Sequence, residues 1–384
     1  MPERVLVVNA GSSSLKLSVL DKADNIVISE TISSRDGKVD DETLKKVIDG
    51  ASPIDAVGHR VVHGGTEFTE PVLIDDDVVH RLEALTDLAP LHQPKSLAGI
   101  RAVQKVLPDV AGVACFDTAF HAHLPAAAST YALPLEWRQR WSLRRFGFHG
   151  LSHAYASRRA EEMMRTGISP TRGAPGSVGS VGPAGELRIV TCHLGAGASL
   201  AAVRNGASVD TTMGFTPLEG LVMATRSGSV DPGLVLWLQQ HGGIAPDELA
   251  DTLEHGSGLL GLAGTDDMRQ VLQAEAGGDG NAALAMGVYL HRLRACIASM
   301  VAALGGVDTL VFTGGVGEKS APVRGRAALG LEFLGVVVDG PANDAATGDS
   351  EITGTGAKVR TFVIEAREDK EIARGVRQVL GATP

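Results

Sequence analysis

Two segments far apart in the chain share one pattern of a strand, a small-residue turn and a second strand. The first is VLVVNAGSSSLKLSVL at residues 5–20, and the second is IVTCHLGAGASLAAV at residues 189–203. Apolar runs on both sides of a turn are typical of paired strands. The similarity is weak, but it fits two related halves that face a cleft, and 384 residues suffice for about two domains.

Hydrophobic periodicity supplies the remaining elements. Further strands are expected at residues 25–29, 54–62, 110–116, 309–313 and 358–364. Helices are expected at residues 41–48, 76–85, 95–106, 232–241, 245–254, 267–276, 282–304 and 369–380. Residues 166–186, rich in Gly, Pro and Ser, predict an exposed mobile loop. We expect an N-terminal domain of residues 1–121 plus 369–384, to which the last helix returns, and a C-terminal domain of residues 122–368.

Composition excludes several classes of partner. The net charge of −10 disfavours binding to nucleic acid or to an anionic membrane, so an anionic substrate requires a local basic cluster. The three cysteines are far apart and predict buried thiols rather than disulfides. We find no signal peptide and no apolar run long enough to span a bilayer. These features together predict a cytoplasmic protein.

Three glycine-containing turns are candidates for phosphate binding. In Asn9–Lys16 small residues such as Ser12 let donors approach phosphate oxygens, and Lys16 adds positive charge. The turn is no Walker loop, because GxxxxGK[ST] is absent and a strand follows it. A hairpin without a ligand explains this turn alone equally well. Two similar turns, HLGAG at 193–197 and GGVGE at 314–318, make a nucleotide-binding cleft the better interpretation.

Four charged or ionisable residues are candidates for phosphoryl chemistry. Arg60, in the strand AVGHRVVHGG, is either a surface residue or a fork for a carboxylate or phosphate. Asp117 ends an apolar strand and could bind metal, act as a base, position a substrate or cap a turn. Arg226 lies in a polar turn, where a solvated side chain is the simpler reading. His149 could hydrogen-bond a transferring phosphoryl group.

A zinc site is disfavoured. His149 and His153 are spaced i,i+4, and His121 and His123 flank an alanine. No HExxH pattern and no cysteine pair accompanies them, and His153 is better explained as a core histidine. Two arginines, a histidine, a lysine and the glycine turns suit phosphoryl transfer, which depends on positioning and charge. The residues alone therefore predict a phosphotransferase and nothing narrower.

At this point a family resemblance emerges. Eight segments, in family order over nearly the whole chain, resemble acetate kinases: VNAGSSSLK, GHRVVHGG, PLHQPKSL, FDTAFH, FGFHGLSH, HLGAGASLAAV, DTTMGFTPLEGLVMATRSGSVDP and FTGGVGE. The resemblance implies an α/β, two-domain actin-like and sugar-kinase-like ATPase fold with duplicated ribonuclease H-like domains and a central cleft. It also implies reversible transfer of the γ-phosphoryl group of ATP to acetate, giving ADP and acetyl phosphate, by a homodimer.

The same resemblance assigns roles to residues. Arg60, Asp117, His149 and Arg226 would be catalytic, with Arg60 also binding substrate. Asn9 and Glu368 would organise Mg²⁺, or Mn²⁺ in its place. The acyl group would contact Arg60, Val62, Leu91, Phe148 and Pro217. ATP or ADP would contact Ser12, Lys16, His193, Leu194, Gly195, Ala196, Gly197, Asp267, Met268, Arg269, Gly315, Val316, Gly317, Glu318 and Lys319.

The chain departs from the family pattern near the nucleotide. Ala196 stands where the family commonly has Asn, which removes one polar side chain. Lys319 replaces the usual Asn, and Ser229 a frequent Asp. Near the C-terminus the sequence AREDKE leaves Glu365 and Asp369 as alternative registers for the metal residue Glu368.

We expect direct in-line transfer. The acetate oxygen attacks the γ-phosphorus without a general base, because a carboxylate is already ionised, so Asp117 acts by placement. A propionate or butyrate kinase is the alternative within the family, although Val62, Leu91 and Pro217 favour a small acyl group. A catalytically silent nucleotide-binding module on the same fold is the alternative of another class, and the intact set of Arg60, His149 and Arg226 argues against it.

Overall fold

The computed structural model describes residues 1–10, 14–33, 41–90, 92–166 and 185–381. The candidates Ser12 and Leu91 lie outside the described residues, as does most of the predicted loop at 166–186. The chain divides into two compact units. Unit 1 comprises Met1–Ala122, Phe148–Tyr155 and Arg367–Pro384, and unit 2 comprises His123–Gly147 and Ala156–Ala366.

Unit 1 is built on a six-stranded sheet with the order β3-β2-β1-β4-β6-β5. Its strands are β1 (Val5–Ala10), β2 (Ser14–Leu20), β3 (Ile26–Ser33), β4 (Ala56–Val61), β5 (Val72–Leu73) and β6 (Gly112–Phe116). β1, β4 and β6 are parallel neighbours, whereas β2, β3 and β5 pair antiparallel. The carboxyl ends of β1, β4 and β6 therefore meet at one edge.

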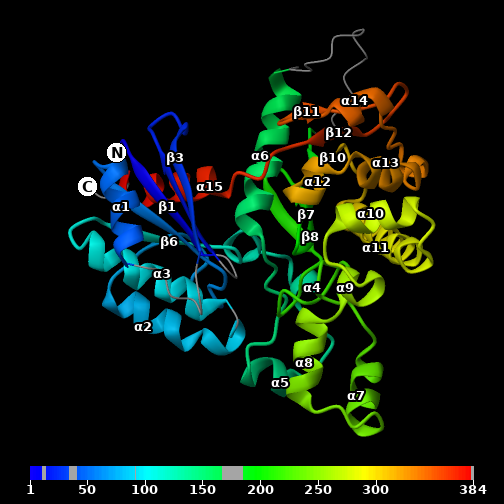
Figure 1. The fold of residues 1–384 in the computed structure, drawn as a ribbon, viewed down its shortest axis with the longest axis horizontal. Coiled ribbons are helices and arrows are strands. Elements are labelled where there is room, and N and C mark those ends of the chain that lie inside the picture. Colours follow the sequence, from blue (N-terminus) through cyan, green and yellow to red (C-terminus); the bar gives the residue numbers. More distant parts are fainter. Residues whose placement is uncertain (11–13, 34–40, 91, 167–184, 382–384) are drawn as a thin grey trace. The chain divides into compact units, whose positions relative to one another are not determined.

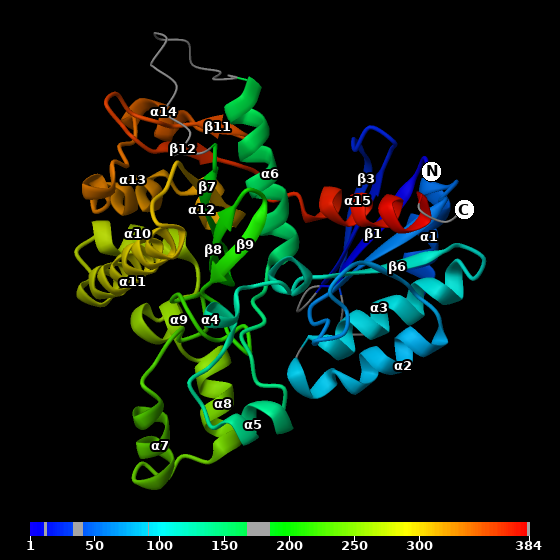
Figure 2. The ribbon, with the colours of Figure 1, turned by 180° about the vertical axis from the view of Figure 1, so that it is seen from behind.

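Alternating side chains of β1 build two cores in unit 1. Leu6 and Val8 pack with α1 (Asp41–Ala51) and α3 (Gln93–Val106), and Val5 and Val7 pack with α15 (Glu368–Gly381). This alternation is what a strand with both faces covered requires. Figures 1 and 2 show α15 on one face of the sheet and α1 and α3 on the other, with α2 (Asp76–Ala84) beside α3. α15 thus packs against β1, β4 and β6.

Unit 2 repeats this topology with a second six-stranded sheet, in the order β11-β12-β10-β7-β8-β9. Its strands are β7 (Arg188–Leu194), β8 (Ala198–Arg204), β9 (Ala207–Thr211), β10 (Thr309–Thr313), β11 (Ser350–Glu351) and β12 (Arg360–Val363). Again three strands, β7, β10 and β12, are parallel and the other three are antiparallel. The α/β class and the duplicated arrangement predicted from the sequence are confirmed.

The helices of unit 2 include short ones that periodicity did not reveal. The long helix α11 (Gly280–Leu304) packs along β7, β8 and β9. Around it and farther out lie α4 (Ala126–Ser129), α5 (Leu135–Arg140), α7 (Pro232–Gln240), α8 (Pro246–His255), α9 (Gly258–Ala263), α10 (Met268–Ala276), α12 (Gly314–Lys319), α13 (Ala321–Leu329) and α14 (Gly340–Ala345). Among the described residues, no helix is both long and apolar enough to cross a bilayer.

Two local expectations need revision. GGVGE is not a turn: it forms the short helix α12, which begins directly after β10 because Gly314 adopts a φ of 77° that lets the chain reverse. The segment Phe148–Tyr155, which the sequence placed in the C-terminal domain, groups with unit 1. It comprises Phe148, His149 and the first part of α6 (Gly150–Thr166), and the Gly150 amide donates to the Asp117 carbonyl at 2.8 Å.

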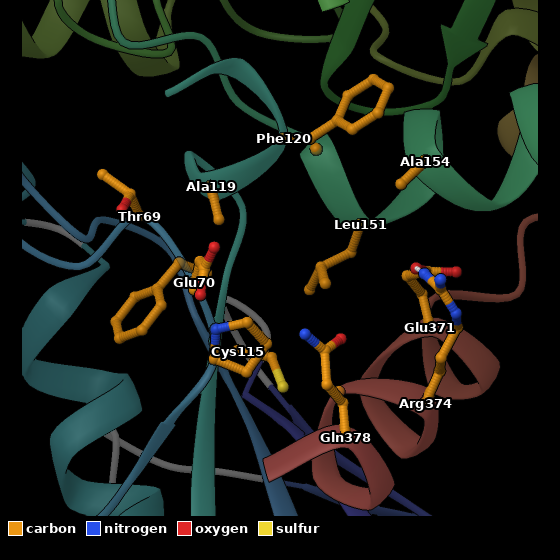
Figure 3. A pocket seen from close by; sticks show the side chains of 14 residues that line it. Thr69, Glu70, Cys115, Ala119, Phe120, Leu151, Ala154, Glu371, Arg374 and Gln378 are labelled. Carbon is orange, nitrogen blue, oxygen red and sulfur yellow. Dashed lines mark hydrogen bonds and ion pairs between the residues drawn. The ribbon is translucent and has the colours of Figure 1, made fainter. Parts of the chain in front are cut away.

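A pocket of about 200 Å³ lies in unit 1 between β6, the start of α6 and α15 (Figure 3). Phe116, Gly150 and Glu371 are among its lining residues, and each is close in sequence to a candidate catalytic or metal residue. Asp117, His149 and Glu368 are not in the described lining. The pocket therefore borders the segments that carry these residues.

Candidate active site

Arg60 and Asp117 form the centre of the site in unit 1. Arg60 lies near the carboxyl end of β4 and Asp117 directly follows β6, so the parallel pairing of these strands brings the two side chains together. Arg60 Nε donates to Asp117 Oδ1 at 3.0 Å, and its NH2 group donates to Oδ2 at 2.5 Å. This is the two-pronged arginine–carboxylate geometry. Arg60 is therefore not an exposed surface residue: it forks onto a carboxylate, and that carboxylate is the side chain of Asp117.

Asn9 and Glu368 join this pair from β1 and from the first turn of α15. The Asn9 side-chain carbonyl accepts from Arg60 NH1 at 3.1 Å, and its amide donates to Glu368 Oε2 at 3.0 Å. Glu368 Oε2 lies 3.7 Å from Arg60 Nε. Glu365, Glu368 and Asp369 are the alternatives for the predicted metal residue. Glu368 makes these contacts, whereas Asp369 pairs with Arg367. The structure thus gathers Asn9, Arg60, Asp117 and Glu368 into one network.

Burial makes this network electrostatically costly to separate. Asp117 is only 1% exposed and Arg60 is 17% exposed. Burial raises the pKa of the Asp117 carboxyl, and Arg60 opposes that shift. Burial acts against the charge of Arg60, but Asp117 and Glu368 outweigh it and hold the pKa of Arg60 above its usual value. The guanidinium therefore stays charged, ready for a second carboxylate or a phosphoryl oxygen.

His149 lies on a strained turn next to this network. Its φ of 57° is left-handed, which is uncommon for a residue other than glycine. The next residue, Gly150, has no room for a side chain, because a Cβ there would lie 2.2 Å from the Asp117 carbonyl oxygen. The turn that carries His149 is therefore held against the backbone of Asp117. Strain of this kind is common at functional sites.

Buried apolar and histidine side chains surround the turn that carries His149. Phe148 is 1% exposed and its ring lies 5.4 Å from that of His63. Val62, which precedes His63 in the sequence, is also buried. His121 is buried, its Nε2 lies 3.2 Å from the Phe148 carbonyl, and burial lowers its pKa to about 4. His153 is buried as expected of a core histidine. Val62 and Phe148 are thus placed in unit 1, near the end of β4 and the turn of His149.

Lys16 lies on β2 opposite Asn9 in the strand register and is exposed. This position is set by the antiparallel pairing of β1 and β2. An exposed lysine beside a residue of the network fits contact with a phosphate group.

Arg226 belongs to unit 2. Its Nε donates to Glu254 Oε2 at 2.9 Å, and its NH1 group lies 3.4 Å from the carbonyl oxygen of Pro217. The solvated reading is therefore not the observed one, since the side chain is 19% exposed and ion-paired. Pro217, a predicted acyl-contact residue, is thus next to Arg226.

The loop around Pro217 is fixed by a polar cluster that the sequence did not predict. Tyr131 donates to Glu219 Oε2 at 2.7 Å and accepts from the Phe215 amide at 2.8 Å. Arg145 NH2 donates to Glu219 Oε1 at 2.8 Å. A Cβ at Gly214 would lie 1.8 Å from Glu219 Oε2, so a larger residue there would displace the Glu219 and Tyr131 side chains. The spacing of Tyr131, Arg145 and Glu219 in sequence carries no signal for this contact.

The two glycine segments of unit 2 lie against each other. A Cβ on Gly314 would lie 2.8 Å from the Leu194 carbonyl oxygen, and one on Gly195 would lie 4.0 Å from the Gly315 amide nitrogen. The Gly195 amide donates to the Gly197 carbonyl at 3.0 Å, and the Ala224 amide donates to the Ala196 carbonyl at the same distance. His193–Gly197 and the start of α12 thus form one surface at the carboxyl ends of β7 and β10. Small residues there allow close approach of a nucleotide.

A buried arginine that sequence reasoning missed holds the end of α12. Arg324 is 1% exposed, and its NH1 group donates to the carbonyls of Gly317 and Glu318 at 2.9 and 2.7 Å. Its Nε and NH2 groups donate to the side chain and carbonyl of Asn343. Glu318 Oε1 in turn accepts from the Ala366 amide at 2.9 Å. Within GGVGEK, then, Glu318 and the Gly317 carbonyl have structural partners, while Lys319 is exposed.

Asp267 and Arg269 pair at the start of α10. Asp267 caps this helix by accepting from the Arg269 amide at 2.8 Å, and its other oxygen accepts from the guanidinium at 2.6 Å. Hydrogen bonds from Arg269 hold the pKa of Asp267 at about 2. Met268 between them is buried. The Arg269 side chain is 90% exposed, so only a ligand at the surface of unit 2 could contact it.

Comparison with known proteins decides the family. The sequence model described as the acetokinase family matches residues 38–374. The chain belongs to the acetokinase family. Among curated relatives, an acetate kinase of Nostoc punctiforme is 45% identical over 87% of this chain and 79% of its own length. One of Shouchella clausii is 39% identical over 97% of this chain and 98% of its own.

Solved structures of the acetokinase family share the fold. The acetate kinase of Porphyromonas gingivalis aligns with a TM-score of 0.85 and 34% identity, over 98% of this chain and 100% of that one. A propionate kinase of Francisella tularensis aligns with a TM-score of 0.87 and 33% identity over the same shares. The family resemblance inferred from the motifs is confirmed, and both acyl specificities occur among these similar structures.

Proposed function

We propose that this chain is an acetate kinase that transfers the γ-phosphoryl group of ATP reversibly to acetate. The observation that carries the proposal is the fork of Arg60 on Asp117, held by Asn9 and Glu368. A guanidinium that already holds one carboxylate in this way is suited to hold the carboxylate of a substrate. Curated relatives named acetate kinase support the same reading.

In this reaction the residues act by placement and charge. Arg60 holds the acetate carboxylate or the acyl phosphate, and Asp117 keeps the guanidinium oriented in the buried site. The substrate oxygen is already ionised and attacks the γ-phosphorus in line. His149 donates a hydrogen bond to the equatorial oxygens, and Arg226 neutralises the charge that develops there.

The donor set in unit 1 fits Mg²⁺. Asp117 and Glu368 offer carboxylate oxygens and Asn9 an amide oxygen, and Mg²⁺ binds one or two carboxylates together with phosphates and water. We propose that Asn9 and Glu368, with Asp117 beside them, hold this ion, which would neutralise phosphate charge. The side-chain amide of Asn9 meets both Arg60 and Glu368, so turning it over would offer its oxygen to the ion.

We assign the nucleotide to unit 2, and contact of Lys16 with a phosphate group stays a prediction. The surface formed by His193–Gly197 and Gly315–Lys319 supplies backbone donors, and Asp267–Arg269 supplies an exposed charged pair. The Ala196 side chain offers no hydrogen-bonding group, and the Ala196 carbonyl already accepts from the Ala224 amide. ATP is the expected nucleotide, and the absent polar group at Ala196 makes GTP the comparison to test.

An assay of acyl acceptors tests the proposal. Acetate, propionate and butyrate are each supplied with ATP or GTP and Mg²⁺, and the acyl phosphate is trapped as hydroxamate. We expect the highest kcat/KM with acetate and lower activity with propionate, because one methylene in such a pocket is worth about 1–3 kcal/mol. Highest activity with propionate would favour the second specificity found among the solved relatives. No hydroxamate despite ATP binding would favour a silent nucleotide-binding module.

We also propose a homodimer. The helices α7 and α5 of unit 2 lie away from its sheet (Figures 1 and 2), and both carry exposed apolar side chains. Leu236 and Trp237 are each 54% exposed and Leu135 is 58% exposed. Such surface suits a second copy. Light scattering should give twice the chain mass for the wild type and the mass of one chain for Trp237→Glu.

We also propose a cytoplasmic location, on the sequence features alone.

A further inference from the structure

We propose that Glu254 is a positioning residue for phosphoryl transfer: it orients the guanidinium of Arg226 toward the reacting phosphoryl group. The inference rests on the proposed acetate kinase function and adds a residue that neither the motifs nor the comparisons assign. Glu254 lies on α8, which periodicity predicted only as a helix. Its oxygen Oε2 accepts from Arg226 Nε at 2.9 Å.

The pair is shielded enough to act as a fixed orienting contact. The side chains of Arg226 and Glu254 are 19% and 17% exposed. One carboxylate oxygen at Nε engages one of the five N–H donors of an arginine and sets the direction of the planar guanidinium. The opposite part of the group, NH1, lies 3.4 Å from the Pro217 carbonyl. Arg226 therefore contacts both Glu254 and the loop proposed to contact the acyl group.

Glu254 occupies a position that the helix itself disfavours. It is the penultimate residue of α8 (Pro246–His255), where the carbonyl groups of the last turn carry partial negative charge. A carboxylate at this end of a helix is unfavourable unless a cation compensates. Arg226 is that cation, and local choices that oppose a helix preference tend to mark functional positions.

The backbone around Arg226 is fastened to the same end of α8. The Thr225 hydroxyl donates to the Glu254 carbonyl at 2.8 Å, and the Ser227 amide donates to the Leu253 carbonyl at 3.1 Å. The Ser257 amide donates back to the Thr225 carbonyl at 2.8 Å. Because these bonds fix the backbone, loss of the Glu254 side chain should reorient the Arg226 side chain without unfolding the loop.

A double-mutant cycle separates positioning from structural support. Glu254→Gln and Glu254→Ala are made in the wild type and in Arg226→Ala, with Glu248→Gln, an exposed residue of the same helix, as the matched control. In the wild-type background we expect kcat to fall about 10-fold or more, with KM for acetate changed less than about threefold, since misplaced catalytic groups lower the rate rather than binding. Glu254→Asp should restore part of kcat.

In the Arg226→Ala background the same substitutions should lower kcat by less than about twofold, because the group they orient is gone. Glu248→Gln should match the wild type, and the melting temperature of Glu254→Gln should stay close to it. An equal loss of kcat in both backgrounds, or full activity of Glu254→Gln, would overturn this inference alone. A wild type that forms no acetyl phosphate would overturn the proposed function and this inference with it.

Discussion

At the scale of single residues, the site in unit 1 is organised around the positive charge of Arg60, which is ion-paired with Asp117. Arg60 lies close to oxygens of Asn9, Asp117 and Glu368. In the proposed reaction the substrate carboxylate would share or replace one of these contacts. Asp117 is then both a support for Arg60 and its resident competitor, which makes its removal informative.

Replacing Asp117 with Asn should lower kcat by about 10²-fold, because a guanidinium without its second anionic oxygen is no longer held in place. The pair is nearly buried, so breaking it should also lower the free energy of unfolding by about 3–5 kcal/mol. Steady-state rates and urea unfolding check the two effects. Turnover close to that of the wild type would exclude an essential role for Asp117.

Gly150 offers a second residue-scale prediction. In Gly150→Ala the new methyl group would collide with the Asp117 carbonyl, so we expect a stability loss of about 1–3 kcal/mol and reduced turnover as the turn of His149 shifts. Gly287→Ala is the matched control, since a Cβ there meets nothing within 4 Å on the exposed side of α11. That variant should gain up to about 1 kcal/mol from better helix propensity. Thermal melts and kcat of both variants test the contrast, which fails if Gly150→Ala behaves like the control.

At the scale of elements, α12 depends on a residue outside its own sequence. Arg324 donates to the last carbonyls of α12 and to Asn343, so it fixes the helix that carries the proposed nucleotide contacts. A lysine cannot reproduce this fork. The sequence of the helix alone would not keep six residues helical.

Arg324→Lys should therefore destabilise the chain and raise KM for ATP more than KM for acetate. Each buried carbonyl left without a donor costs about 1–3 kcal/mol. Arg326→Lys, whose side chain pairs with Glu275 at the surface, is the control and should remain near the wild type. Equal changes in both KM values would argue that Arg324 supports the fold in general rather than the nucleotide surface.

The strands were predictable from the sequence because their apolar runs are buried on both faces, as in β1 and β10. The long helices α3 and α11 followed from their periodicity. The short helices α4, α5, α9 and α12 were not predictable, since tertiary contacts such as those of Arg324 stabilise them. Likewise Arg60 and Asp117 could be singled out as residues ending parallel strands, whereas Glu254 and Tyr131 reach their partners only through the fold.

At the scale of the whole molecule, the two units repeat one topology and place glycine turns and charged residues after equivalent strands. In unit 1 these are Asn9, Arg60 and Asp117, after or within β1, β4 and β6. In unit 2 they are His193–Gly197 and Gly314, after β7 and β10. The repeated topology thus accounts for the similarity of the two segments, to which we assign different roles: acyl substrate and metal for the first and nucleotide for the second.

Buried histidines make the stability of the chain depend on pH. Burial lowers the pKa of His59 to about 3 and those of His63 and His121 to about 4. The unfolded chain takes up protons near pH 6.5 while the folded chain does not, so stability is complete above about pH 6.5 and falls as the pH drops toward 4. Each histidine contributes about 1.4 kcal/mol per pH unit in this range.

Urea unfolding at pH 7 and pH 5 tests this dependence. His59→Gln should shrink the difference between the two pH values by about 2 kcal/mol. His80→Gln is the control, because His80 is 84% exposed and its loss should leave the difference unchanged. A difference that both substitutions leave intact would mean that buried histidines do not set the acid sensitivity.

Arg60 is the residue that we propose to hold the acyl substrate of a phosphoryl transfer to acetate. The most direct test of this proposal is the initial rate of acetyl phosphate formation from ATP, acetate and Mg²⁺ by the wild type and by Arg60→Ala, followed by ³¹P NMR. We predict that the wild type forms acetyl phosphate and that the variant is slower by about 10³-fold or more. A wild type that binds ATP but makes no acetyl phosphate, or a variant of equal rate, would contradict the account.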